Sequence, residues 1–155
     1  MAEYLRTTRE CALDDLNPVL AVALCAHSQK HQLGDIHLNA LICCETSSTK
    51  QKKGLFGGKP EIILTGLILT PGWLIWATTV NGAPAAVLSA RLRDIQVLDY
   101  EKSTQYKLIP DTGLDVSGLR MDTIDLGSAF IGLGPEPAAQ KLRTLLKQAL
   151  ATPDL

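Results

Sequence analysis

Apolar residues occur along this chain in short runs, some of them continuous and others alternating with polar residues at every second position. Alternation is typical of a β-strand that buries one face, and a short continuous run between turns is typical of a strand buried on both faces. Glycine, proline and asparagine separate the runs, as they do in turns. The pattern predicts seven strands, which span residues 36–45, 61–69, 72–79, 85–89, 95–100, 114–119 and 126–133.

The clearest part of the pattern is a pair of apolar runs on either side of the turn at residues 70–72. A second turn, Asn81-Gly82, follows the second run, and this dipeptide is favoured in two-residue hairpin loops. Trp73 and Trp76 lie three positions apart on the strand between the two turns, so their side chains face opposite sides of the sheet. Only one of the two tryptophans can therefore be fully buried.

The pattern is different towards the N-terminus. The first predicted strand carries apolar side chains at every second position, namely Ile36, Leu38, Ala40 and Ile42. Residues 46–60 are polar and glycine-rich, so they are expected to form an exposed loop. Residues 1–16 show no clear pattern and are expected to form a loose lead-in.

Two helices are expected, one before the strands and one after them. Asn17-Pro18 supplies an N-cap and a proline at the first helical position, and the residues from Val19 to His31 are good helix formers. The second helix begins at Pro137 and runs to about Leu150, with one apolar stripe along it. The stripe consists of Ala138, Leu142, Leu145, Leu146 and Ala149. Strands and helices together predict an α+β fold.

A length of 155 residues suits one domain, placed here at residues 17–150, with residues 151–155 as a tail. The net charge is −1 and only 5% of residues are aromatic, so the basic excess and stacking side chains of a nucleic-acid binder are missing. Residues 62–90 carry no charge and are long enough to cross a bilayer, but glycine, proline and asparagine divide them into strand-sized pieces. A membrane-spanning helix is therefore the less favoured interpretation.

Four cysteines, Cys11, Cys25, Cys43 and Cys44, form no C-x-x-C motif and are expected to be free thiols in a cytoplasmic protein. His27 and His31 lie one helical turn apart, but the residues between them lack the glutamate of H-E-x-x-H, so no metal site is predicted. The chain also lacks the G-x-S-x-G elbow of a serine nucleophile. No catalytic residue and no cofactor is therefore predicted, and the chain is not expected to be an enzyme.

The order of the elements, seven antiparallel strands followed by one amphipathic helix, resembles that of pleckstrin-homology-like (PH-like) domains. Three segments carry the resemblance, namely residues 66–76, residues 86–95 and Phe130–Leu133 leading into the last helix. The resemblance covers roughly residues 36–150 and is strongest to the bacterial and GRAM-like branches. The resemblance implies a seven-stranded antiparallel barrel of two near-orthogonal sheets, capped by the C-terminal helix. The N-terminal helix would be an addition to this barrel.

The resemblance also implies a non-enzymatic module that binds another protein or assembles with itself. The sequence does not identify the ligand of this module. PH-like domains meet anions through lysines in the first hairpin loop. The matching segment here holds four lysines, no acid and an apolar tip, so an anionic membrane surface is the alternative partner. Phosphoinositide binders carry an arginine on the strand after this loop, and residues 62–64 lack it. The competing interpretation is that the lysine-rich segment is a solvated loop that binds nothing. The candidate residues are Lys50, Lys52, Lys53, Leu55, Phe56 and Lys59.

Overall fold

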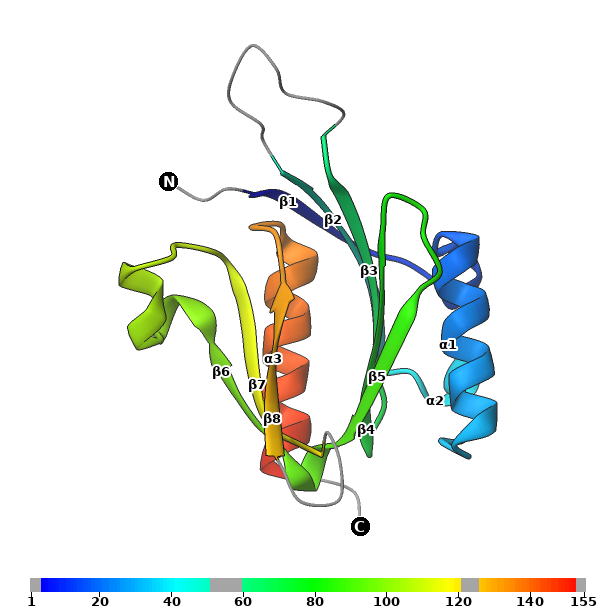
Figure 1. Cartoon of the computed structure of the whole chain (residues 1–155). Helices are drawn as coiled ribbons and strands as arrows, with labels where there is room; N and C mark the ends of the chain where they lie inside the picture. The colour runs from blue at the N-terminus through cyan, green and yellow to red at the C-terminus, as the bar shows by residue number, and fades with distance from the viewer. Residues whose placement is uncertain (1–3, 51–59, 121–125, 153–155) are drawn as a thin grey trace.

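The computed structural model describes residues 4–50, 60–120 and 126–152, which form eight strands in two antiparallel sheets. Figure 1 shows the two sheets facing each other with a helix between them. The five-stranded sheet has the order β1 (Tyr4–Glu10), β2 (Ile42–Lys50), β3 (Ile62–Leu69), β4 (Trp73–Val80) and β5 (Ala86–Arg91). The three-stranded sheet has the order β6 (Gln96–Asp99), β7 (Gly113–Arg120) and β8 (Leu126–Gly132).

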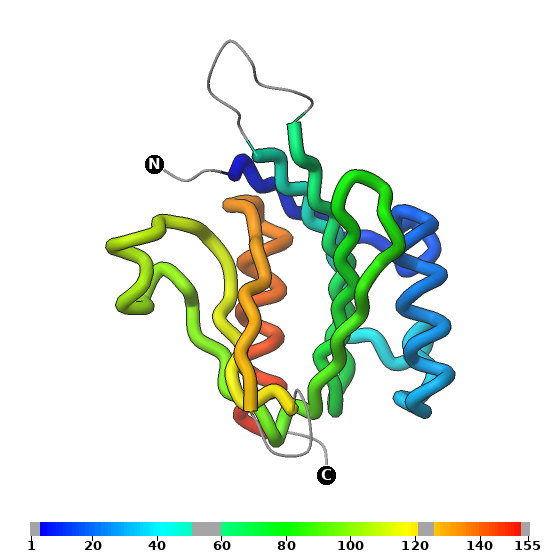
Figure 2. Tube along the Cα trace, viewed as in Figure 1, coloured from blue at the N-terminus to red at the C-terminus, as the bar shows by residue number. Residues whose placement is uncertain are grey.

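The helices lie on both sides of the five-stranded sheet. α1 (Pro18–Lys30) covers its outer face, whereas α3 (Pro137–Ala151) lies between the two sheets, as the chain trace in Figure 2 also shows. Short helical segments join the remaining elements. They are η1 (Leu13–Asp15), α2 (Ile36–Asn39), η2 (Leu92–Asp94), η3 (Tyr100–Lys102) and η4 (Thr104–Lys107).

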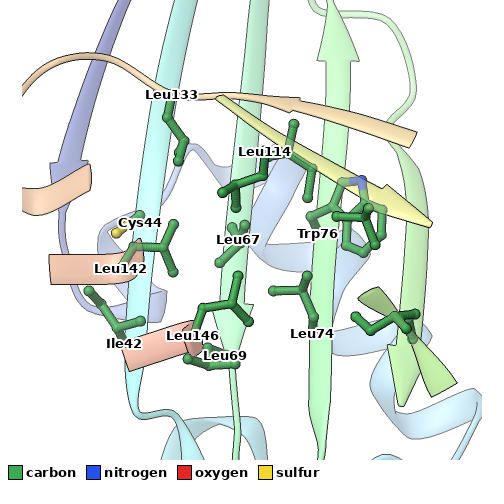
Figure 3. Close-up of a cluster of buried hydrophobic side chains, with 14 of the residues drawn as sticks. Ile42, Cys44, Leu67, Leu69, Leu74, Trp76, Leu114, Leu133, Leu142 and Leu146 are labelled. Carbon is green, nitrogen blue, oxygen red and sulfur yellow. The ribbon is translucent and has the colours of Figure 1, made fainter. Parts of the chain in front are cut away.

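Two hydrophobic clusters hold these layers together. The larger cluster fills the space between the sheets, where Leu142 and Leu146 of α3 contact apolar side chains from both sheets (Figure 3). The second cluster lies between α1 and the five-stranded sheet and includes Leu20 and Leu24. Trp76 belongs to the first cluster and is only 4% exposed, while Trp73 packs half-buried against the second. The prediction that only one tryptophan is fully buried is confirmed.

The α+β class and most element positions are also confirmed. The side chain of Asn17 accepts a hydrogen bond from the backbone N–H of Val19 at 3.0 Å, as expected of an N-cap. Asn81 and Gly82 have φ angles of +52° and +76°, and the backbone N–H of Ala83 donates to the carbonyl oxygen of Val80 at 3.0 Å, so the chain turns where expected. The connection is longer than a two-residue hairpin loop, however, because β4 and β5 pair only from Thr78 opposite Ala86. The described strands nevertheless form two separate sheets and not one closed barrel.

The expectation of a loose lead-in at residues 1–16 is wrong, because Tyr4–Glu10 forms β1 at the edge of the five-stranded sheet. The hydrophobic pattern does not indicate this strand, because the side chains that face the inside of the fold are polar. Thr8 is buried, and its hydroxyl is hydrogen-bonded to that of Thr46 at 2.8 Å and accepts the N–H of Gly134, also at 2.8 Å. A strand that buries hydrogen-bonded polar groups shows no apolar alternation.

The expected strand at residues 36–45 is wrong in its first half. Asp35 caps α2, because its carboxylate accepts the backbone N–H groups of His37 and Leu38, and Leu38 is 80% exposed. The strand begins only at Ile42, and it continues to Lys50, through residues expected to be loop. Within the described part of the chain, no helix is both long enough and apolar enough to span a bilayer.

Candidate functional site

The outward surface of the three-stranded sheet carries large apolar side chains that are exposed to solvent. Leu98, Asp115 and Phe130 lie side by side across β6, β7 and β8 in the strand register. Leu98 is 61% exposed and Phe130 is 39% exposed, whereas the alternate residues Val116 and Ile131 are buried against α3. The sheet therefore buries one face in the core, and its outward face presents Leu98 and Phe130 to solvent beside the polar row Gln96, Ser117 and Ser128.

The segment after β6 extends this apolar surface. The ring of Tyr100 lies 5.0 Å from that of Phe130 and 6.4 Å from that of Tyr106, between ring centroids. The Tyr100 hydroxyl donates a hydrogen bond to the carbonyl oxygen of Ile109 at 2.6 Å, which fixes the segment against the sheet. Leu108 is 84% exposed and Ile109 is 68% exposed. We call these exposed or half-exposed apolar side chains, which Tyr100 links through its contacts with Phe130, Tyr106 and the backbone of Ile109, the apolar face; they are Leu98, Tyr106, Leu108, Ile109 and Phe130.

Two charged groups accompany the apolar face. Asp115 lies between Leu98 and Phe130, and Lys107 ends η4, directly before Leu108. Within the described ranges, no ion pair involves either residue. The surface thus presents one acid and one base whose charges are available to a partner.

The sheet that carries the apolar face is fastened to α3 by ion pairs on its inner side. Nη1 of Arg143 lies 2.5 Å from Oδ1 of Asp99, and Nζ of Lys147 lies 3.2 Å from Oδ2 of the same carboxylate. Burial would raise the pKa of Asp99, but the hydrogen bonds from Arg143 and Lys147 outweigh it, so that the pKa is lowered. These contacts make the face a fixed surface of the fold.

Arg6 supports the same surface from β1, and sequence reasoning missed it. Its guanidinium carbon lies 4.6 Å from the ring centroid of Tyr4 and 5.2 Å from that of Phe130. Its Nε and Nη2 donate to the carboxylate of Asp111 at 2.8 and 2.7 Å. An arginine in an unpatterned stretch carries no sequence signal of burial, because its partner lies 105 residues away.

Of the six residues proposed from the sequence to bind an anion, only Lys50 is described. It is the last residue of β2, and its backbone N–H donates to the carbonyl oxygen of Glu61 at 2.9 Å. Lys52, Lys53, Leu55, Phe56 and Lys59 lie outside the described residues. The proposed contact with an anionic surface stays a prediction.

His27 and the four cysteines are buried or half-buried in the packing of the fold, whereas His31 and His37 are exposed. Nε2 of His27 is hydrogen-bonded to the Ser89 hydroxyl at 2.8 Å, and burial, His31 and Lys30 lower the pKa of His27. Burial raises the pKa of the thiols of all four cysteines, to about 12 for Cys44. A thiol with a raised pKa is protonated at neutral pH and is a weak nucleophile. In residues 4–50, 60–120 and 126–152, no three metal-ligating side chains converge.

Comparisons with protein-family models, with curated proteins and with solved structures found no match. The resemblance to PH-like domains therefore remains a prediction from the sequence. Any statement about function has to rest on the surfaces that the described residues form.

Proposed function

We propose that this chain is a non-enzymatic PH-like module that associates with a second copy of itself through the apolar face. The order of its elements supports the PH-like assignment. Strands β2–β5 and β6–β8 followed by α3 match the seven strands and terminal helix of the resemblance, with β1 and α1 as N-terminal additions. The proposed activity is binding, and the partner is a protein.

The observation that carries this proposal is the exposure of large apolar side chains on β6, β8 and the segment that contains η4 and leads to β7. Contiguous apolar surface rimmed by polar residues is characteristic of protein–protein contacts. Complete burial of a leucine, isoleucine or phenylalanine side chain contributes about 1.5–3 kcal/mol. Four such side chains from each of two copies would contribute up to about 12–24 kcal/mol, which exceeds the cost of association, about 4–15 kcal/mol. The difference is of the order of the roughly 8 kcal/mol that corresponds to micromolar affinity, so we expect a dimer in that range.

The charges favour a second copy as the partner. In a two-fold symmetric contact the same surface is used twice, so that residue i of one copy meets residue j of the other and the reverse. A surface with one acid and one base can satisfy both charges in this way, with Asp115 of each copy opposite Lys107 of the other. Such pairs select a partner and its orientation more than they add affinity.

The test is the molar mass in solution, measured by sedimentation equilibrium over a range of concentrations that extends well above micromolar. The wild-type protein should pass from monomer to dimer, and Leu108→Ser with Ile109→Ser should shift the transition to higher concentration. The matched control is Val22→Ser, because Val22 is 69% exposed on α1, away from the apolar face.

The charge arrangement gives a second readout. Asp115→Lys and Lys107→Asp should each weaken the dimer, because each places like charges opposite one another, and the double variant should restore it. A wild-type protein that stays monomeric throughout the range would refute the proposal. If Val22→Ser weakened the dimer as much as the Leu108→Ser, Ile109→Ser variant, the apolar face would not be the contact and the proposal would also be refuted.

A further inference from the structure

Two adjoining cavities lie beside the turn between β3 and β4. The first lies on the five-stranded sheet, and the second extends from it to Gly118, Leu119 and Arg120 of β7 in the other sheet. Their volumes are about 370 and 430 Å³, and both are lined by Trp73, Arg91 and Arg93. The first cavity is completed by the buried Leu33 and by Asn39 at the end of α2. We call this first cavity the arginine groove. It is independent of the apolar face, which belongs to the other sheet.

The strand register brings the three shared residues together. Trp73, the first residue of β4, lies opposite Arg91, the last residue of β5. Leu92 follows Arg91, is 2% exposed, and donates its backbone N–H to the carbonyl oxygen of Gly72 at 3.1 Å. Arg91 and Arg93 therefore flank an anchored residue, so their positions at the groove are set by the backbone.

The side chain of Arg91 is also oriented. Its guanidinium carbon lies 5.3 Å from the centroid of the Trp73 ring, within the range of a cation–π contact. A guanidinium held on an indole keeps its N–H donors available at its rim, because the ring contacts only its flat face. Arg91 thus presents its hydrogen-bond donors at the groove without using them on the ring.

The charges at the arginine groove are unbalanced. Arg6, Arg9 and Arg143 each bind a carboxylate, but among the described residues neither Arg91 nor Arg93 forms an ion pair or a side-chain hydrogen bond. None of the described residues that line the first cavity is acidic, while the second contains Asp94 together with Arg120. In the described part of the chain, the groove is therefore a cavity with two unused guanidinium groups and no counter-charge of its own.

We propose that the arginine groove binds a soluble phosphate monoester. A guanidinium carries five N–H donors in a planar fork that matches phosphate oxygens in pairs. Two such forks suit the three oxygens and the double charge of a phosphate monoester better than the two oxygens of a carboxylate. The organic part of the ligand would lie against the indole of Trp73 and the side chain of Leu33. The amide of Asn39 offers a further donor.

The experiment is calorimetric titration of the full chain with phenyl phosphate, which carries both a phosphate and an aromatic ring. Arg91→Gln and Arg93→Gln should each weaken binding at least tenfold, which corresponds to about 1.4 kcal/mol. Arg91→Lys should also weaken it, because an ammonium keeps the charge but lacks the fork. The matched control, Arg9→Gln, removes an exposed guanidinium from β1 and should leave the affinity unchanged. Melting temperatures of all variants should match that of the wild type, since each substituted side chain is exposed.

Tryptophan fluorescence supplies a second readout. Because Trp73 lines the groove and Trp76 is buried in the core, the ligand should change the emission of the wild type but not that of Trp73→Phe. No heat and no emission change with phenyl phosphate would overturn the proposal. So would binding that persists in both glutamine variants, or binding that is lost instead when Lys50, Lys52 and Lys53 are changed to Glu.

Discussion

Replacing Arg6 by methionine should destabilise the fold by about 3–5 kcal/mol, because it removes the buried guanidinium of an ion pair and leaves the largely buried carboxylate of Asp111 without that partner. The Arg6 side chain is 8% exposed and that of Asp111 is 16% exposed. Besides the two hydrogen bonds to Asp111, Nη1 of Arg6 donates to the Ser48 hydroxyl at 2.6 Å. The substitution keeps most of the apolar volume and removes three hydrogen bonds, two that join β1 to Asp111, shortly before β7, and one that joins β1 to β2.

The matched control lies on the same strand. Nη2 of Arg9 is 3.0 Å from Oε1 of Glu45, but the Arg9 side chain is 52% exposed, so this pair is screened by solvent. Arg9→Met should cost no more than about 1 kcal/mol. Both variants remove a guanidinium from an edge strand and leave a carboxylate of similar burial, since Glu45 is 13% exposed and Asp111 16%. They differ in the burial of the arginine and in the aromatic rings that Arg6 contacts.

The assay is urea unfolding at neutral pH, followed by far-ultraviolet circular dichroism and analysed for midpoint and slope. A lower midpoint with an unchanged slope would report a loss of stability in the folded state. Arg6→Lys should be intermediate, because one ammonium cannot reproduce the two-point contact with Asp111. The reasoning fails if Arg6→Met and Arg9→Met lower the free energy of unfolding equally.

Three further predictions concern the core, the pH dependence and the basic segment. Trp76→Ala should cost roughly 3–5 kcal/mol in the same assay and Trp73→Ala clearly less, and equal costs would contradict the packing. Because the pKa of Asp99 is lowered in the folded state, its contribution to stability is present above its unfolded pKa of about 3.8 and is lost as the pH falls through the lower folded value. Asp99→Asn should therefore flatten the decline in unfolding free energy below pH 3.8, and an unchanged decline would contradict the assignment. The protein should sediment with anionic vesicles in a salt-sensitive manner, and changing Lys50, Lys52 and Lys53 to Glu should abolish this binding. If the wild-type protein does not sediment with the vesicles, the membrane partner is excluded.

Local sequence signals were enough to place the elements whose formation depends on nearby residues. The Asn17 cap, the start of the last helix at Pro137 and the turn at Asn81-Gly82 are all found where the chain predicts them. The alternation of side chains along β4 likewise separated Trp76 from Trp73. Caps, turns and strand faces follow from backbone preferences over a few residues, and these preferences can be read along the chain.

The remaining features depend on residues that are distant in sequence. β1 forms because its polar side chains find partners, among them Asp111 and Gly134, more than a hundred residues further on. The same is true of the surfaces proposed to bind partners. Arg91 meets Trp73 only through the register of β4 and β5, and Leu98 meets Phe130 only across β7. Burial and hydrogen bonding between distant segments arise only when the chain is packed. The local sequence therefore predicts that a polar residue is exposed, even where a distant hydrogen-bond partner allows it to be buried.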